Sequence, residues 1–248
     1  MTLAIVSAMR EELAALLGQL EGARTERLGG RVFHTGRLAG REVVLVLSGI
    51  GKVAAAATAA LLVDRLGARA LLFTGVAGGL GAGVRVGDVV VATELLQHDL
   101  DASPLFPRWE VPLTGRSRFG AEPALAATLA AACDAVLAAP HPGLAALGLH
   151  APRRHTGLIV SGDRFVASVA ESAALRAALP DALAVEMEGA AMAQVCADFG
   201  CPLAVLRTVS DRADDSAHVD FGRFVAEVAA EYSRDIVLAA LAQGFAAG

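Results

Sequence analysis

Short runs of β-branched and leucine residues alternate with helical patterns along most of the chain. Several of these runs are apolar throughout, which is typical of strands covered on both faces. The runs that predict strands are Leu3–Ser7, Val43–Ser48, Ala70–Thr74, Asp88–Thr93, Thr156–Ser161, Ala182–Glu186 and Leu203–Val209. Helices are predicted over Met9–Leu20, Val53–Leu66, Glu122–Ala139, Ala167–Ala178, Gly189–Phe199 and Phe221–Ala242. The alternation predicts an α/β fold: a single domain over residues 1–248 with a mixed, largely parallel sheet flanked by helices.

Composition narrows the class of protein. Of the 248 residues, 55% are hydrophobic and 4% aromatic, which is enough for one substantial core. The mean hydropathy is +0.54, yet the longest uncharged stretch that looks insertable, "ALLFTGVAGGLGAGV", is broken by glycines and is shorter than the ~20 residues of a membrane-spanning helix. The net charge of −5 is interspersed, which argues against a nucleic-acid partner. The three cysteines match no zinc or redox spacing and predict a reduced, cytoplasmic protein.

Polar residues collect where predicted strands end, and ligands bind at the carboxyl ends of strands in open α/β sheets. Glu11 and Glu12 follow the first strand, and Arg207, Ser210 and Asp211 lie at the end of the last strand or just after it. Acidic residues are also favoured at any helix N-terminus by the helix dipole, and a polar loop with an Asp cap would explain the second group. The pattern alone is compatible with either explanation: a ligand site at the strand ends, or ordinary helix-start and loop residues.

The stretch "AVEMEGAAMAQVC", residues 184–196, places Glu186 and Glu188 inside an apolar run. Carboxylates are rarely buried unless they are paired or face a ligand. On a strand, these two side chains share a face, because the side-chain period is two. If a strand ends within "LAVEME", both acids can face one cavity. Periodicity does not show whether Glu12, Glu188 and Asp211 converge.

Two glycine-rich segments follow apolar strands. "SGIGK", residues 48–52, ends like a P-loop, but Val46 and Val53 stand where that motif needs Gly and Ser or Thr, so it predicts a glycine turn before a helix. "FTGVAGGLGAGV", residues 73–84, either lets the backbone approach a ligand closely or forms a mobile turn.

Two further segments suggest less. "QHDLD" offers His98, Asp99 and Asp101, but no second group is placed to complete a metal site, and we expect none. Residues 99–121 contain three prolines and the only tryptophan, which is typical of a lid, a binding loop or disorder.

A set of motifs, in order and at compatible spacing, resembles the 5′-methylthioadenosine/S-adenosylhomocysteine nucleosidases of the nucleoside phosphorylase superfamily. The resemblance extends from near Leu3 to about Phe224. It is carried by "AMREE", "SGIGKVAAA", "TGVAGGL", "VGDVVVATE", "GLIVSGDRFV", "VEMEGAAMAQVC" and "RTVSDRAD". The resemblance implies a twisted mixed sheet, a homodimer, and no cofactor or metal. It implies hydrolysis of the adenine N-glycosidic bond of a small nucleoside substrate, in methionine salvage.

The resemblance also implies roles for individual residues. Glu12 would activate the attacking water, and Asp211 would protonate adenine N7. Glu188 and Met187 would hold the ribose, with Arg207 near the water and Glu188. The other implied substrate-binding residues are Ala77 and Gly78 beside the ribose and base, Phe165 stacked on adenine, Val166 at its edge, Glu186, and Phe221 at the tail pocket.

The chemistry explains these residue types. Breaking an N-glycosidic bond passes through an oxocarbenium-like state, as in glycosidases. Adenine is a poor leaving group as an anion, so an acid must deliver a proton. Asp211 can do so only if burial or a neighbouring carboxylate raises its pKa, or if it shares a proton with the purine. A carboxylate at Glu188 would stabilise the cationic sugar.

Two departures from the family pattern affect the substrate assignment. Val76 stands where the family often has a hydroxyl residue, and residues 102–121 match the family's lid poorly. The alternatives are a phosphate-dependent purine nucleoside phosphorylase, a futalosine-type nucleoside hydrolase, and a nucleoside-binding protein without activity. Phosphate would be repelled by Glu12 with only Arg10 to offset the charge, and a binder needs no acid–base pair.

Overall fold

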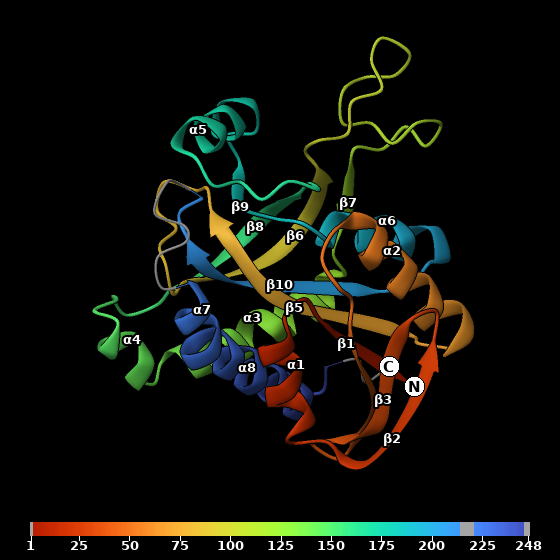
Figure 1. Ribbon diagram of the computed structural model, residues 1–248, viewed down its shortest axis with the longest axis vertical. Helices are drawn as coiled ribbons and strands as arrows, with labels where there is room; N and C mark the ends of the chain where they lie inside the picture. The colour runs from red at the N-terminus through yellow and green to blue at the C-terminus, as the bar shows by residue number, and fades with distance from the viewer. Residues whose placement is uncertain (1, 214–220, 246–248) are drawn as a thin grey trace.

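The computed structural model describes residues 2–213 and 221–245 and has the predicted α/β fold, with a mixed sheet flanked by helices (Figure 1). Its ten-stranded sheet has the order β10-β6-β8-β9-β5-β1-β4-β3-β2, with β7 paired to β6. The strands are β1 (Leu3–Ser7), β2 (Glu21–Leu28), β3 (Arg31–Leu38), β4 (Arg41–Leu47), β5 (Ala70–Gly79), β6 (Val89–Gln97), β7 (Arg118–Gly120), β8 (Arg154–Ser161), β9 (Ala182–Glu186) and β10 (Leu203–Asp211).

Strand β5 organises the sheet, because it pairs with three others. It runs parallel to β1 and β10 and antiparallel to β9. Since β10 also pairs with β6, and β6 with β8, the strands β5, β10, β6, β8 and β9 close into a ring. The ends of β1, β5, β9 and β10 lie close together as a result, and the site is built there.

Helices cover both faces of the sheet (Figure 1). Helices α1, α3 and α8 pack on one face over a core that includes Ile5, Leu72 and Ile236, and α2 and α6 pack on the other over Val6, Phe73 and Met192. The helical segments are α1 (Arg10–Leu17), α2 (Lys52–Ala60), η1 (Leu61–Arg65), α3 (Pro123–Leu137), α4 (Pro142–Ala146), α5 (Val169–Ala178), α6 (Gly189–Phe199), α7 (Phe221–Phe224), η2 (Val225–Ala229) and α8 (Ala230–Ala242). No described helix is long and apolar enough to cross a membrane.

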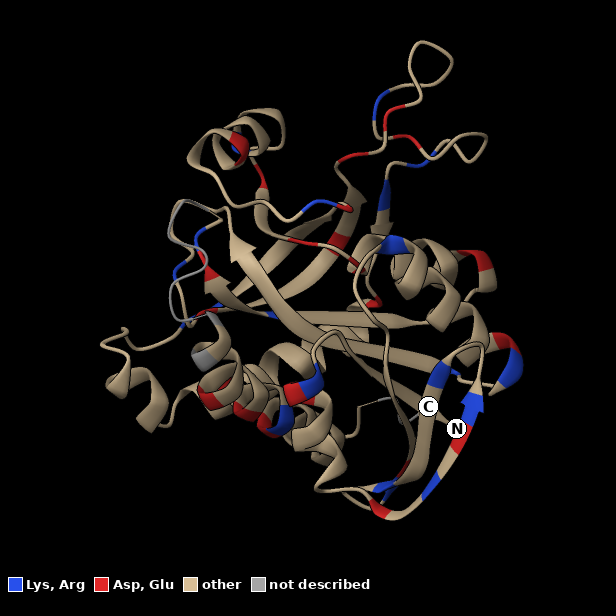
Figure 2. Ribbon diagram, viewed as in Figure 1, with Lys and Arg blue, Asp and Glu red and all other residues tan. Residues whose placement is uncertain are grey.

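The structure corrects several predicted boundaries. Helix α1 ends at Leu17 rather than Leu20, and the chain then forms β2 and β3, which were not predicted. Side chains of β2 are exposed from Glu21 to Arg27, so no apolar alternation marks that strand. Figure 2 shows charged residues along β2 and β3 and few in the central strands. The predicted helix over Phe221–Ala242 is divided into α7, η2 and α8.

Glycine-rich and proline-rich segments also differ from expectation. Strand β5 continues through Gly79 instead of stopping at Thr74, so the first half of "FTGVAGGLGAGV" is strand. Residues 99–117 project from the body of the molecule (Figure 1). This loop is anchored where Trp109 Nε1 donates to the carbonyl oxygen of His98 at 3.0 Å. The 139–152 segment contains the short helix α4.

Candidate active site

A largely apolar cavity of about 230 Å³ lies at the ends of β5, β9 and β10. Ala8 and Met9, which follow β1, form part of its wall, as does Val76. The predicted site residues that line it are Ala77, Gly78, Phe165, Val166, Glu186, Met187, Glu188 and Asp211. Glu12 and Arg207 lie behind the wall, fully buried. Phe221 begins α7, but its side chain lies outside the described residues.

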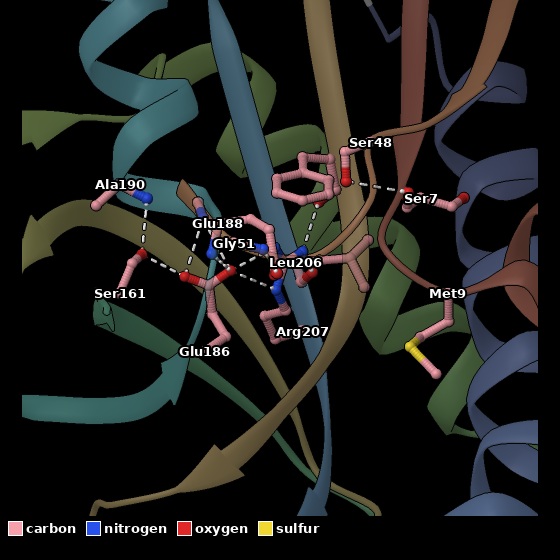
Figure 3. Close-up of polar contacts among 12 residues, drawn as sticks. Ser7, Met9, Ser48, Gly51, Ser161, Glu186, Glu188, Ala190, Leu206 and Arg207 are labelled. Atoms are coloured by element: carbon pink, nitrogen blue, oxygen red, sulfur yellow. Dashed lines mark hydrogen bonds and ion pairs between the residues drawn. The ribbon is translucent and has the colours of Figure 1, made fainter. Parts of the chain in front are cut away.

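Glu186 and Arg207 form an ion pair inside the protein (Figure 3). Arg207 Nη2 lies 2.6 Å and Nε 3.2 Å from Glu186 Oε2. The backbone N–H groups of Glu188 and Gly189 also donate to this carboxylate, at 3.1 and 2.8 Å to Oε2, and Ser161 Oγ donates to Oε1. The sequence placed Arg207 near Glu188. The guanidinium group pairs directly with Glu186, which faces β10 at the end of β9, and its charge also acts on the nearby Glu188, where it opposes the rise in pKa that burial causes.

Glu188 is the N-cap residue of α6 and lies two residues beyond the end of β9. It therefore does not share a strand face with Glu186 as the side-chain period predicted, yet both residues line the same cavity. Glu188 Oε1 accepts a hydrogen bond of 2.8 Å from the backbone N–H of Gly51. Burial, reinforced by the charge of Glu186, raises the pKa of Glu188 to about 7. The "SGIGK" turn thus caps α2, as predicted, and also holds a site carboxylate.

Glu12 is buried in the first turn of α1, whereas Glu11 is exposed. Glu12 Oε2 accepts a hydrogen bond from the backbone N–H of Met9 at 3.3 Å, and Glu12 Oε1 accepts one from the hydroxyl group of Ser233 at 2.9 Å. Burial raises the pKa of Glu12 to about 7, against the opposing effects of the Ser233 hydrogen bond and the Arg207 charge. Such a carboxyl group is ionised in part of the molecules at neutral pH, which suits a general base.

Asp211 ends β10, just past a bulge in its pairing with β5. Ser210 Oγ donates to Asp211 Oδ2 at 2.8 Å, and the backbone N–H of Ala213 donates to Oδ1 at 2.7 Å. The opposite residue on β5 is Gly78, where a Cβ would lie 3.0 Å from Asp211 Oδ1 and 2.9 Å from the Ala213 Cβ. A glycine is therefore needed at position 78 for this carboxylate to reach the cavity.

The remaining wall comes from the segment between β8 and α5. Phe165 is 44% exposed and Val166 is buried, so an aromatic face stands at the mouth and the backbone lies deeper. No residue of the 99–121 loop lines the cavity in the part of the chain that the structure describes.

The sequence analysis missed two hydroxyl residues that hold site carboxylates: Ser161 on Glu186 and Ser233 on Glu12. Ser161 ends a predicted strand, and Ser233 lies in the middle of a helix far along the chain. Neither has a local sequence signal, since a serine in an apolar element is compatible with many roles.

The acidic residues of "QHDLD" are held by other groups. Asp99 pairs with Lys52 Nζ at 2.6 Å and accepts the backbone N–H of Asp163 at 2.8 Å. Asp101 accepts the backbone N–H of Ser103 at 3.0 Å. Within residues 2–213 and 221–245 there is no group of three or more His, Cys, Asp or Glu side chains that could hold a metal ion.

Comparison with known proteins places this fold. A sequence model of the phosphorylase superfamily matches residues 2–242, so the chain is a member of that superfamily. A solved structure of 5′-methylthioadenosine/S-adenosylhomocysteine nucleosidase from Neisseria meningitidis, in complex with methylthio-immucillin-A, is 37% identical with a TM-score of 0.85, covering 98% of this chain and 99% of that one.

Two further structures agree. The Streptococcus pneumoniae MTA/SAH nucleosidase in complex with 8-aminoadenine is 36% identical, TM-score 0.85, covering 97% of this chain and 99% of that one. The nucleosidase from Colwellia psychrerythraea in complex with adenine is 37% identical, TM-score 0.84, with coverages of 98% and 95%. The chain belongs to the family of 5′-methylthioadenosine/S-adenosylhomocysteine nucleosidases.

Proposed function

We propose that this protein is an N-glycosyl hydrolase that cleaves 5′-methylthioadenosine and S-adenosylhomocysteine with water and releases adenine, a step of methionine salvage. The observation that carries the proposal is a buried carboxyl group, Glu12, whose pKa is raised to about 7 behind an apolar cavity edged by Glu188 and Asp211. Relatives with the same fold are named for this activity and hold adenine or its analogues.

The proposed reaction begins with water activation. Glu12 takes a proton from a water molecule as its oxygen forms a bond to C1′ of the ribose, and the C1′–N9 bond breaks. Asp211 delivers a proton to N7, so adenine leaves as a neutral molecule. In this step Asp211 reacts in its protonated form, and the Ser210 hydroxyl and the Ala213 N–H hold its carboxyl group in place for the transfer.

The sugar and base have separate contacts in this proposal. Glu188 accepts hydrogen bonds from the ribose hydroxyl groups and stabilises positive charge on the ring, with Met187 beside it. Phe165 stacks on adenine, the backbone at Val166 reads its edge, and Ala77 and Gly78 line the base. Glu186 contributes to substrate binding indirectly, because it holds Arg207 and the backbone of Glu188 in position. Phe221 borders the pocket for the 5′ group.

Water is favoured over phosphate as the nucleophile on electrostatic grounds. A phosphate dianion beside Glu12 would need a free cation, but the nearby guanidinium group of Arg207 is already neutralised by Glu186 at 2.6 Å.

We also propose that residues 1–248 form one catalytic domain, that the enzyme works in the cytoplasm as a homodimer, and that it needs no cofactor. The free state of its three cysteines agrees with that compartment.

Adenine release measured with and without phosphate tests this proposal. Methylthio-, butylthio- and homocysteinyl-adenosine should all be cleaved at rates that do not depend on phosphate, and plain adenosine should be poorer because it lacks the apolar tail. Strict dependence on phosphate would indicate a phosphorylase. Preference for a futalosine would reassign the substrate, and tight nucleoside binding without turnover would indicate a binding protein.

A further inference from the structure

The hydroxyl group of Ser233 connects two buried polar side chains from different elements. Its Oγ lies 2.9 Å from Glu12 Oε1 and 2.6 Å from Thr74 Oγ1. Thr74, Ser233 and Glu12 are all 0% exposed. Helix α8, strand β5 and helix α1 therefore meet in a short row of polar atoms within an otherwise apolar core.

The chemistry of the groups fixes the direction of these hydrogen bonds. An ionised carboxylate only accepts hydrogen bonds. When Glu12 is ionised, Ser233 must donate its hydroxyl hydrogen to Oε1, and the Ser233 oxygen then accepts the hydrogen of Thr74. A hydrogen bond to a charged acceptor is roughly twice as strong as one between neutral groups. The row therefore favours the ionised form of Glu12 and fixes the rotation of its carboxylate.

The surroundings of Glu12 show why this donor matters. Burial disfavours the charged form, and the neighbouring Glu11 on α1 adds to that effect. Against them act the Ser233 hydrogen bond, the Arg207 charge from β10 and the Met9 backbone N–H, of which Ser233 has the largest effect. Because Arg207 is shared with Glu186, its charge opposes the effect of burial on Glu12 less than the Ser233 hydrogen bond does.

We propose that Ser233, oriented by Thr74, is a positioning residue for the general base: it aligns the Glu12 carboxylate and keeps it in the proton-accepting form. Ser233 and Thr74 do not line the cavity, so they act through Glu12 and not on the substrate. The inference rests on the proposed function only in naming Glu12 as the base.

The pH dependence of kcat/KM tests the inference. Loss of a hydrogen bond to a charged group should move the acid limb of Ser233→Ala upward by about one pH unit or more. Relative to the wild type, the variant should lose about fivefold at pH 7 and recover towards equality at higher pH. Ser233→Thr keeps the hydroxyl group and should keep the limb. Thr74→Val leaves Ser233 without its donor and should give a smaller shift in the same direction.

A matched control is Ser172→Ala, which removes a buried hydroxyl that donates to the Val169 carbonyl oxygen rather than to a carboxylate; its acid limb should not move. A pH-independent loss in Ser233→Ala, or an unmoved limb in both Ser233→Ala and Thr74→Val, would overturn the inference. If Ser233→Ala does not fold, Thr74→Val alone decides.

A second readout does not depend on activity. The Glu12 carboxyl resonance of ¹³C-labelled protein, assigned by its loss in Glu12→Gln, should titrate at higher pH in Ser233→Ala than in the wild type. If the wild type releases no adenine, the proposed function fails, and this titration still decides whether Ser233 governs Glu12.

Discussion

The side chains of Arg207 and Glu186 contact each other almost out of reach of solvent: they are 0% and 2% exposed, and the shortest N···O distance is 2.6 Å. The same Glu186 carboxylate accepts the N–H groups that begin α6. One acidic side chain thus fixes both the strand that ends in Asp211 and the helix that begins beside Glu188. Stability and site geometry depend on the same pair.

Glu186→Gln should lower the free energy of unfolding by about 3–5 kcal/mol, because it leaves the Arg207 charge buried without a counter-charge. Urea denaturation at neutral pH measures this loss. The exposed pair of Arg118 and Asp181, at 2.7 Å, provides the control. Asp181→Asn should cost no more than about 1 kcal/mol. Equal losses for the two variants would mean that burial of the Arg207–Glu186 pair has no energetic consequence.

Glu12→Gln and Asp211→Asn should each lower turnover by at least about a hundredfold, since each amide keeps the shape of the side chain and removes one proton transfer. Glu11→Gln should be nearly silent, because Glu11 is exposed and points away from the core that holds Glu12. Adenine release, thermal melting and nucleoside binding should be measured for all three. Normal turnover in Glu12→Gln or Asp211→Asn would refute the assigned roles.

The raised pKa of Glu12 also predicts how stability depends on pH. Its value is about 7 in the folded chain against 4.5 for an unperturbed group, so the folded state binds the extra proton between these values. The stability from this group is complete below about pH 4.5 and is lost as the pH rises through 7. Relative to the wild type, Glu12→Gln should therefore gain up to about 3 kcal/mol of unfolding free energy between pH 4.5 and pH 8.

Urea titrations of both proteins near pH 5 and pH 8 measure this gain as a difference of differences. The other raised carboxyl group, Glu188, is present in both proteins and cancels. A stability difference that does not change with pH would show that Glu12 is not protonated in the folded state in this range.

The protein should be a homodimer in solution. Side chains that are large and apolar stand exposed on the single chain, among them Val53 at 81% and Leu113 at 91%. Leu113 lies in the projecting 99–117 loop (Figure 1). Light scattering over a dilution series to micromolar concentration should give twice the mass of the chain. A monodisperse monomer at that concentration would contradict the prediction.

Activity should survive exhaustive treatment with EDTA. Both proton transfers are assigned to carboxyl groups. Asp99, which belongs to the "QHDLD" segment considered above as a metal site, is paired with Lys52. Parallel samples with added zinc or manganese provide the comparison. An activity that EDTA removes and either metal restores would establish a metal requirement.

Much of this fold could be predicted because the central strands are apolar throughout and the helices between them are periodic. The predicted bounds of β1, β9 and α6 agree with the structure residue for residue. Strand β2 could not be predicted because its side chains are exposed and show no apolar alternation. Strand β3 was missed because its buried apolar residues, Phe33 and Leu38, are five positions apart and do not alternate either. The end of β5 was missed because glycines within a closely packed strand look the same as those in a turn.

The site was predictable in its residue types and less so in its pairings. Motif order assigned Ala77, Glu188 and Asp211 to one site, and all three residues line the same cavity. The partner of Arg207 depends on how β9 faces β10, a tertiary relation that sequence spacing does not contain. Ser233 reaches Glu12 across 221 positions of sequence, and no local pattern carries that contact.

The contact between Gly78 and Asp211 restricts how this enzyme can change. A methyl group at position 78 would fall 3.0 Å from Asp211 Oδ1 and 2.9 Å from the Ala213 Cβ, closer than ordinary packing allows. A mutational path that enlarges residue 78 therefore has to reshape the 211–213 turn at the same time. Laboratory evolution that changes one residue at a time should find this position closed, and redesign of the base pocket should begin from residue 76 or 165 instead.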